Sequence, residues 1–153
     1  MKIADILSEE LVIPELHAAS KSDALDEMTD VLTVAHPEID RQRLREVLGE
    51  REKLGSTAIG GGIAIPHGRL PGLDQVLAVF GRSPAGVDFE SVDGAPTKLF
   101  FLLVAPEDSS GMHLKALARI SRLLREQRVR ERLLECSDRA GLLRIIREED
   151  AKY

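Results

Sequence analysis

The chain opens with two stretches in which apolar residues recur at the three- and four-residue intervals of a helix that buries one face. The first follows Ser20, a residue type that caps helix N-termini, and ends before Pro37. Its apolar positions are Ala24, Leu25, Met28, Val31 and Leu32. The second helix is predicted to begin at Asp40 and to stop near Gly55. Its inner face carries Leu44, Val47 and Leu48.

Strand patterns occur before the first predicted helix and again in the middle of the chain. Residues 11–16 are apolar around a central Pro14, which indicates an edge strand or a strand end, because proline cannot donate to a sheet ladder. Residues 76–81 and 87–92 are two further strand candidates. The stretch 98–106 contains LFFLLVA, a continuous apolar run that is typical of a strand buried on both faces.

Helical patterns return after this strand. A long helix is predicted over residues 110–127, a short one over 130–136, and a last one from its cap at Asp138 to about Glu148. The inward positions of the long helix are predicted to be Leu114, Leu117, Ile120 and Leu124. Helices thus both precede and follow the strands. This order predicts a single α/β domain over residues 1–153, with a small mixed β-sheet flanked by helices on both sides.

Composition narrows the setting in which this domain works. The chain has 153 residues and a net charge of −5, which does not favour wholesale binding to nucleic acid. The lone Cys136 cannot form an internal disulfide and points to a reducing compartment. The longest apolar run covers seven residues, Leu99 to Ala105, whereas a membrane span needs about 20. We therefore expect a cytoplasmic protein with no nucleic-acid partner and no membrane insertion.

A glycine-rich segment carries the first candidate for chemistry. Residues 55–72 read GSTAIGGGIAIPHGRLPG, which predicts a loop that approaches a ligand closely, with a short strand at 63–65. Pro66 and Gly68 are expected to hold the imidazole of His67 outward in a turn. An imidazole, with a pKa of about 6.5, can act as a nucleophile and carry a phosphoryl group without any metal or organic cofactor. The alternative is an ordinary turn histidine.

Five other residues are candidates for a phosphate site around this histidine. His113 lies in the first turn of the long predicted helix, where backbone N–H groups favour an anion and a neutral imidazole that donates a hydrogen bond. Arg51 lies near the end of the second helix, and its guanidinium fork can donate two bonds to a phosphoryl group. Ser56, Thr57 and Gly68 are candidate phosphate-binding residues of the loop. The alternatives are an exposed helix histidine, a solvated arginine, and hydroxyls that bond the turn itself.

Other chemistries fit the sequence poorly. The glycine run lacks the G-x-x-x-x-G-K-[ST] pattern of a P-loop, one cysteine cannot build a thiolate metal site, and no G-x-S-x-G elbow occurs. We therefore predict no metal site. A basic stretch places Lys115, Arg119 and Arg122 on one helical face. We favour a solvated surface there, and the alternative is a docking surface for an acidic partner or for nucleic acid.

The segment REKLGSTAIGGGIAIPHGRL, residues 51–70, resembles the active-site segment of the mannitol/fructose-type IIA domains of the bacterial phosphotransferase system, and the nitrogen-regulatory branch most of all. The H-L-x-x-L pattern that starts at His113 matches as well, and the similarity covers essentially the whole chain. The resemblance implies a mixed sheet flanked by helices. It also implies that His67 is phosphorylated at Nε2, that His113 stabilises the phosphoryl group and that Arg51 lies beside the site. Gly61 is a departure, because similar sequences often have Asn there.

The same resemblance implies partners. The phosphoryl donor is expected to be a phosphorylated histidine phosphocarrier protein, itself charged from phosphoenolpyruvate through enzyme I. A nitrogen-regulatory IIA binds target proteins according to its phosphorylation state, whereas a sugar-transport IIA passes the group to a cysteine of a IIB domain. The absence of a fused IIB, IIC or carrier domain favours the regulatory function, with fructose/mannitol uptake as the alternative. Around the loop, an exposed apolar docking rim is expected from Ile63, Ile65, Leu70 and Leu73.

Overall fold

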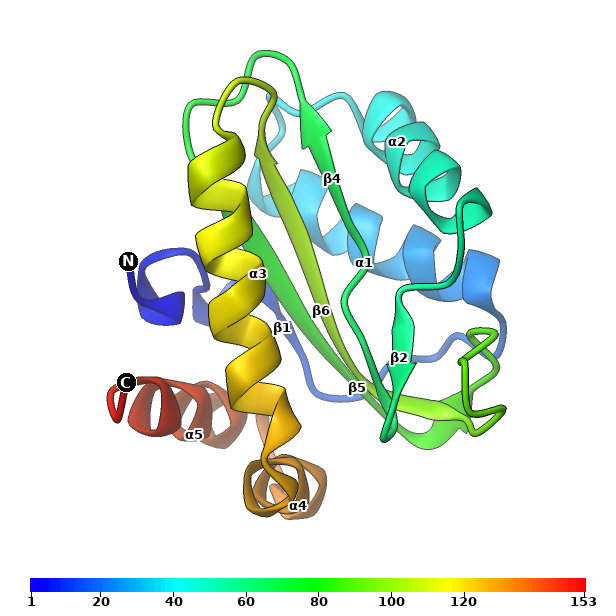
Figure 1. Cartoon of the computed structure of the whole chain (residues 1–153), viewed down its shortest axis with the longest axis vertical. Helices are drawn as coiled ribbons and strands as arrows, with labels where there is room; N and C mark the ends of the chain where they lie inside the picture. The colour runs from blue at the N-terminus through cyan, green and yellow to red at the C-terminus, as the bar shows by residue number, and fades with distance from the viewer.

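The computed structural model of the chain describes residues 1–109 and 111–153 in full and residue 110 in its backbone alone. In this described part, six strands form one mixed sheet with helices on both of its faces, which makes a single α/β domain (Figure 1). The strands are β1 (Val12–Ile13), β2 (Ala58–Gly60), β3 (Ile63–Ala64), β4 (His67–Leu70), β5 (Leu77–Val87) and β6 (Thr97–Pro106). The helices are α1 (Lys21–Ala35), α2 (Arg41–Lys53), α3 (Ser110–Arg125), α4 (Gln127–Glu135) and α5 (Arg139–Asp150). Two short 3₁₀ turns, Ile3–Asp5 and Glu9–Leu11, precede β1.

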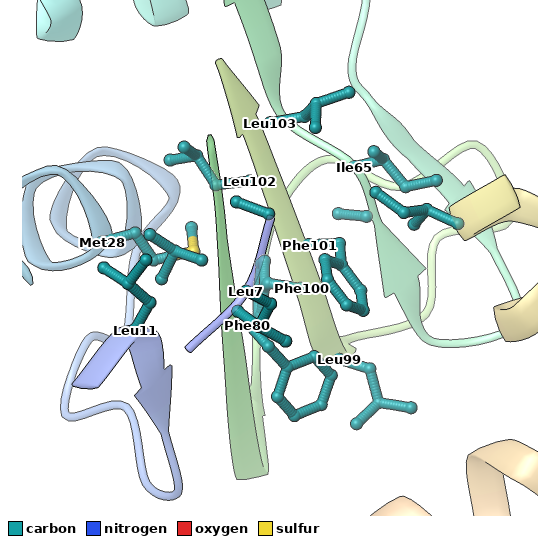
Figure 2. Close-up of a cluster of buried hydrophobic side chains, with 14 of the residues drawn as sticks. Leu7, Leu11, Met28, Ile65, Phe80, Leu99, Phe100, Phe101, Leu102 and Leu103 are labelled. Atoms are coloured by element: carbon teal, nitrogen blue, oxygen red, sulfur yellow. The ribbon is translucent and has the colours of Figure 1, made fainter. Parts of the chain in front are cut away.

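Strand β6 is the centre of the sheet. It pairs antiparallel with β5 on one side and parallel with β3 and β4 on the other, while β1 pairs parallel with β5 at one edge. Residues 99–105 of β6 are at most 1% exposed. Figure 2 shows Leu102 on the side of Met28 and Leu103 on the side of Ile65, so both faces of this strand are covered. The predicted doubly buried strand is confirmed, and the segment 11–16 does contribute an edge strand, of which only Val12–Ile13 pair with the sheet.

The helices sit where the sequence places them. In Figure 1, α3 crosses in front of β6, while α1 and α2 lie behind the sheet, against β5 and β4. Ser20 caps α1, since its side chain accepts a hydrogen bond from the Asp23 amide at 3.1 Å. Asp40 caps α2 and Asp138 caps α5 in the same way. Among the described residues, the helices are too short or too polar for any of them to reach across a bilayer.

The long predicted helix differs from the observed one in two respects. It ends at Arg125, because Glu126 adopts an extended conformation, and α4 starts at Gln127 rather than at residue 130. Its buried face holds His113, Ala116, Ile120, Leu123 and Leu124. Leu114 was predicted to point inward but is 64% exposed. Successive residues of a helix are about 100° apart around its axis. The buried face begins at His113, so the next residue, Leu114, points away from the core.

The predicted strand at residues 76–81 is confirmed as the first part of β5, whereas the predicted strand at 87–92 is wrong as a separate element. Strand β5 runs on to Val87, with an irregularity in its pairing to β6 between Arg82 and Val87, and residues 89–92 belong to no strand. The turn-favouring residues Pro84 and Gly86 hid the continuation of the strand from Arg82 to Val87. The shift in pairing accommodates them inside one continuous strand.

The glycine-rich segment contains more sheet than the sequence predicts. The expected strand at 63–65 is present as β3, but β2 and β4 flank it. His67 is therefore the first residue of β4 and not part of a turn, which corrects the prediction. The tight β2–β3 turn is made by Gly60, Gly61 and Gly62, all with positive φ, of which Gly61 has φ 68°.

Gly61 has a conformational explanation. At φ 68° it lies in the left-handed region, which glycine enters freely and which Asn tolerates better than most other residues. The exchange between Asn and Gly at this position therefore preserves the turn.

The turn and the histidine lie at different levels of the sheet. Ile63 of β3 pairs with Leu99 of β6, and His67 of β4 pairs with Leu103. These two positions on β6 are four residues apart, which is about 13 Å along a strand. The turn at Gly61 thus lies well away from the histidine.

Candidate functional site

His67 is held by the sheet and by its own neighbours. Strand β4 lies parallel to β6 with His67 beside Leu103, whose amide donates to the carbonyl of Pro66 at 2.9 Å. The ring is half-buried, and its Nδ1 lies 2.8 Å from the carbonyl oxygen of Ile65. A carbonyl oxygen only accepts, so Nδ1 must carry the hydrogen of the neutral ring. The lone pair is then on Nε2, which makes this nitrogen the nucleophile.

Arg51 meets the same nitrogen from the last turn of α2. Its Nε is 3.4 Å from Nε2 of His67, a contact that requires Nε2 to accept and so agrees with the tautomer that Ile65 imposes. Its Nη1 donates to the carbonyl of Gly55 at 3.0 Å, which fixes the plane of the guanidinium. Nη2 makes no hydrogen bond within the described part of the chain. A guanidinium is therefore anchored beside the nucleophile with donors left for an incoming anion.

His113 completes the cluster from the first turn of α3. Its ring centroid is 5.3 Å from that of His67, and the two rings are tilted by 51°. The side chain is buried, with the residue 8% exposed, and its Nδ1 finds no hydrogen-bond partner among the described residues. Most buried polar atoms in folded proteins are paired, and functional sites are one place where the exceptions occur. The structure thus brings together the three side chains that the sequence singled out as His67, His113 and Arg51.

Burial and nearby positive charge keep both rings neutral. Burial is the main cause that lowers the pKa of His67, and the positive charge of Arg51 lowers it further. The carbonyl of Ile65 and the carboxylate of Glu52 act in the opposite direction. The pKa of His113 is lowered first by burial, then by the repulsion that would arise if both rings were protonated, and then by the positive charge of Arg69. Both imidazoles are therefore uncharged near neutral pH, one with a free lone pair and one with an N–H to donate.

Two residues near the site were missed by sequence reasoning. Arg69 follows His67 by two positions on β4, so both side chains leave the same face of the strand, toward α3. Glu52 is buried under the loop that follows α2. The two-residue alternation would have indicated Arg69 had β4 been predicted as a strand, whereas a buried glutamate next to an arginine gives no signal in sequence.

A pH titration tests the neutral state of His67. Since its pKa is lowered, the ring should lose its proton at a lower pH than an ordinary histidine, whose pKa is about 6.5. The expected result in an NMR titration of the folded protein is a midpoint for His67 below that of the same residue in urea-unfolded chain. Arg51→Ala should move the midpoint upward, because it removes one of the two causes of the shift. A midpoint at or above the unfolded value would contradict the site electrostatics described above.

The loop residues occupy different places from the three central side chains. The hydroxyl of Ser56 donates to the carbonyl of Phe89 at 2.6 Å, and the hydroxyl of Thr57 donates to Glu52. The geometry thus favours the alternative in which both hydroxyls hold the loop itself. Gly68 lies under α2, where a Cβ would come within 2.5 Å of Val47 Cγ1. Phosphate binding by these residues stays a prediction.

The expected apolar rim is not exposed. Ile63, Ile65 and Leu70 are 4–5% exposed and belong to the hydrophobic core. Leu73 is half-buried. Large exposed apolar side chains in the neighbouring segments are instead Leu54, Ile59, Met112 and Leu114. The prediction of the rim residues is therefore wrong.

The basic face of α3 is partly neutralised within the molecule. Arg119 forms an ion pair with Asp150 at 2.6 Å and also donates to two carbonyls at the C-terminal end of the chain. Arg122 lies over the ring of Tyr153 at 5.0 Å, and Lys115 is exposed. Arg119 is therefore a tie between α3 and α5 and not a freely solvated charge.

Comparison with known proteins places this site in a family context. A family model described as phosphoenolpyruvate-dependent sugar phosphotransferase system, EIIA 2, matches residues 5–149. A nitrogen regulatory protein from Bradyrhizobium diazoefficiens is 44% identical over 149 residues, which are 95% of each chain. A fructose-specific EIIABC component from Bacillus subtilis is 39% identical over 150 residues, 98% of this chain but 24% of that protein. The crystal structure of nitrogen regulatory protein IIA-Ntr from Neisseria meningitidis superposes with a TM-score of 0.88 at 33% identity, covering 94% of this chain and 98% of that one.

Proposed function

The chain belongs to the EIIA 2 family of the phosphoenolpyruvate-dependent sugar phosphotransferase system, and from this we propose that Nε2 of His67 accepts a phosphoryl group and passes it on. The observation that carries the proposal is the tautomer of His67. Its Nδ1–H is committed to the Ile65 carbonyl at 2.8 Å, which leaves a lone pair on Nε2 beside a guanidinium. A nucleophilic nitrogen and an anion-binding cation are the two groups that phosphoryl acceptance requires.

The transfer follows from this arrangement. The lone pair of Nε2 attacks the phosphorus of a phosphorylated histidine phosphocarrier protein. The donor's phosphorus–nitrogen bond then breaks, and its electron pair remains on the donor imidazole. The ring of His67 becomes positively charged when it is phosphorylated, and the Ile65 carbonyl that accepts its Nδ1–H stabilises that charge. Arg51 and His113 donate hydrogen bonds to the phosphoryl oxygens.

We further propose that the protein acts in the cytoplasm as a nitrogen-regulatory IIA, binding targets according to its phosphorylation state. Support comes from relatives named nitrogen regulatory protein, which match at 44% and 36% identity over 95% of their own lengths. The second candidate is transfer to a IIB cysteine for sugar uptake. The 39% identity to a fructose-specific EIIABC component favours it.

The proposal is tested by reconstitution. The protein is incubated with phosphoenolpyruvate, enzyme I and each available histidine phosphocarrier protein, and its intact mass is followed. We expect the gain of a single phosphoryl group that depends on all three components. An unchanged mass with every carrier protein would refute the carrier function.

The regulatory part has its own test. A phosphoryl group adds a charge of about −1.5 to −2 at the site, so a target that packs there must desolvate it or supply cations. Baits of His67→Ala, His67→Asp and enzymatically phosphorylated parental protein should therefore recover different proteins, or different amounts, from cell extract. Charge reversal at Lys115 should leave the difference intact if the exposed part of the basic face is merely solvated. Identical recovery by all three baits would leave sugar transport as the better account.

A further inference from the structure

Glu52 is a buried carboxylate that the proposed reaction does not use. It follows Arg51 near the end of α2, and its side chain is 4% exposed. One oxygen accepts from the Thr57 amide at 3.0 Å and from the ammonium of Lys21 at 3.0 Å, and the other accepts from the Thr57 hydroxyl. Burying a carboxylate is costly unless it is paired and hydrogen-bonded. The Glu52 carboxylate is both paired and hydrogen-bonded: Lys21 supplies the opposite charge, and Thr57 supplies two hydrogen bonds.

The bonds continue from this carboxylate to the nucleophile. The carbonyl of Thr57 accepts from the Ile65 amide at 3.1 Å, and the carbonyl of Ile65 lies 2.8 Å from Nδ1 of His67. Each step is a direct contact. A contiguous path therefore runs from Lys21 through Glu52, Thr57 and Ile65 to the ring that we propose to be phosphorylated.

The far end of the path is also fixed. Lys21, at the start of α1, lies over the ring of Phe89 at 5.2 Å and is itself largely buried. The carbonyl of Phe89 accepts from the Ser56 hydroxyl at 2.6 Å. The loop between α2 and β2 is thus clamped at two successive residues, by Glu52 at Thr57 and by Phe89 at Ser56. The backbone that orients Ile65 has little freedom to move while both clamps hold.

We propose that Glu52 is a positioning residue for phosphoryl transfer: by clamping Thr57 it fixes the Ile65 carbonyl, which holds the His67 ring as the Nδ1–H tautomer with Nε2 free. The expected effect on phosphoryl transfer rests on the proposed function, whereas the expected effect on the His67 tautomer does not. Glu52 makes no hydrogen bond to His67, so its effect on the tautomer passes through the backbone. Its negative charge also raises the pKa of His67 and so partly offsets the effect of burial.

The test replaces Glu52 by Ala and by Gln and reads two quantities. Long-range ¹H–¹⁵N NMR of the unphosphorylated protein reports which ring nitrogen of His67 carries the hydrogen. Intact-mass kinetics report the rate of phosphorylation. For Glu52→Ala we expect a mixture of tautomers and a rate that falls about tenfold, or about 1.4 kcal/mol of barrier. Glu52→Gln should lie between this variant and the parental protein, since an amide oxygen still accepts from the Thr57 amide but carries no negative charge to oppose that of Lys21.

Controls separate positioning from general damage. Glu50→Ala removes an exposed carboxylate two residues away on the same helix and should change neither quantity. If Glu52→Ala fails to fold, Glu52→Gln and Thr57→Val carry the test, because Thr57→Val removes the hydroxyl bond and keeps the amide bond. Folded variants that retain the pure Nδ1–H tautomer, at whatever rate, would overturn the inference. The tautomer is measured without any donor, so a parental protein that accepts no phosphoryl group would refute the proposed function and leave this result readable.

Discussion

His67→Ala is expected to gain no phosphoryl group from phosphoenolpyruvate, enzyme I and a histidine phosphocarrier protein, under conditions in which the parental chain is fully labelled. The substitution removes the one imidazole whose tautomer is set by a main-chain carbonyl, at 2.8 Å, and whose other nitrogen faces a guanidinium. The other three histidines lack this combination in the described structure: His113 has an unpaired Nδ1, and His17 and His36 lie beside carboxylates. Transfer should fall to the background of the assay.

The matched control for this variant is His113→Ala, which removes the neighbouring ring and leaves the proposed acceptor in place. Its labelling should be slower but complete at long times. Because the side chain of His67 is half-buried at the start of a strand whose pairing is made by the backbone, His67→Ala should keep its fold, which circular dichroism can verify. A phosphoryl group found on folded His67→Ala would assign the acceptor to another residue.

Much of the scaffold was predictable because local chemistry and tertiary structure agree there. Ser20, Asp40 and Asp138 cap their helices as their residue types predict. The apolar run of β6 is typical of a strand covered on both faces, and it is one. At these places a residue's own preference and its surroundings point the same way.

The predictions failed where tertiary contacts, and not local residue preferences, determine the conformation or the burial of a segment. Strand β4 has four residues among glycines and prolines, too few for a periodic signal, and it exists because its backbone pairs with β6. Missing it left His67 in a turn and hid Arg69 on the same face. The prediction of the apolar rim failed for a related reason: Ile63, Ile65 and Leu70 lie in a glycine-rich segment that was expected at the surface, and they are core residues in the structure.

Residue chemistry alone made His67, His113 and Arg51 separate candidates, and only the resemblance joined them into one candidate site. Nothing in spacing alone requires Arg51 to approach His67, 16 residues later, or His113 to face the same ring. The three side chains come from α2, β4 and α3, and these elements meet because of the sheet order. Strand β4 lies beside β6, and α3 directly follows β6 in the chain. The proposed role of Glu52 is harder still to predict from the sequence. It acts through backbone groups of Thr57 and Ile65, which every residue type other than proline possesses.

Arg51→Ala is expected to slow phosphorylation of His67 by about ten- to a hundredfold without abolishing it. A hydrogen bond to a charged group is worth about 1.5–3 kcal/mol, and each 1.36 kcal/mol of barrier is a factor of ten in rate. Part of that energy is already present before the reaction, since Nε of Arg51 contacts Nε2 of His67 in the unphosphorylated protein. Only the bonds that strengthen as negative oxygens arrive contribute to the rate.

Two substitutions at this position divide the effect. Arg51→Lys keeps the charge but loses the planar fork that donates both to Gly55 and toward His67. If orientation matters more than charge, Arg51→Lys will be nearly as slow as Arg51→Ala; if charge alone matters, it will approach the parental rate. Arg43→Ala is the control, because Arg43 is a half-exposed arginine of the same helix that pairs only with Glu46 in the described structure. A parental rate in Arg51→Ala, with the control also unchanged, would mean that the guanidinium beside Nε2 takes no part in the transfer, and the site geometry proposed for this protein would have to be abandoned.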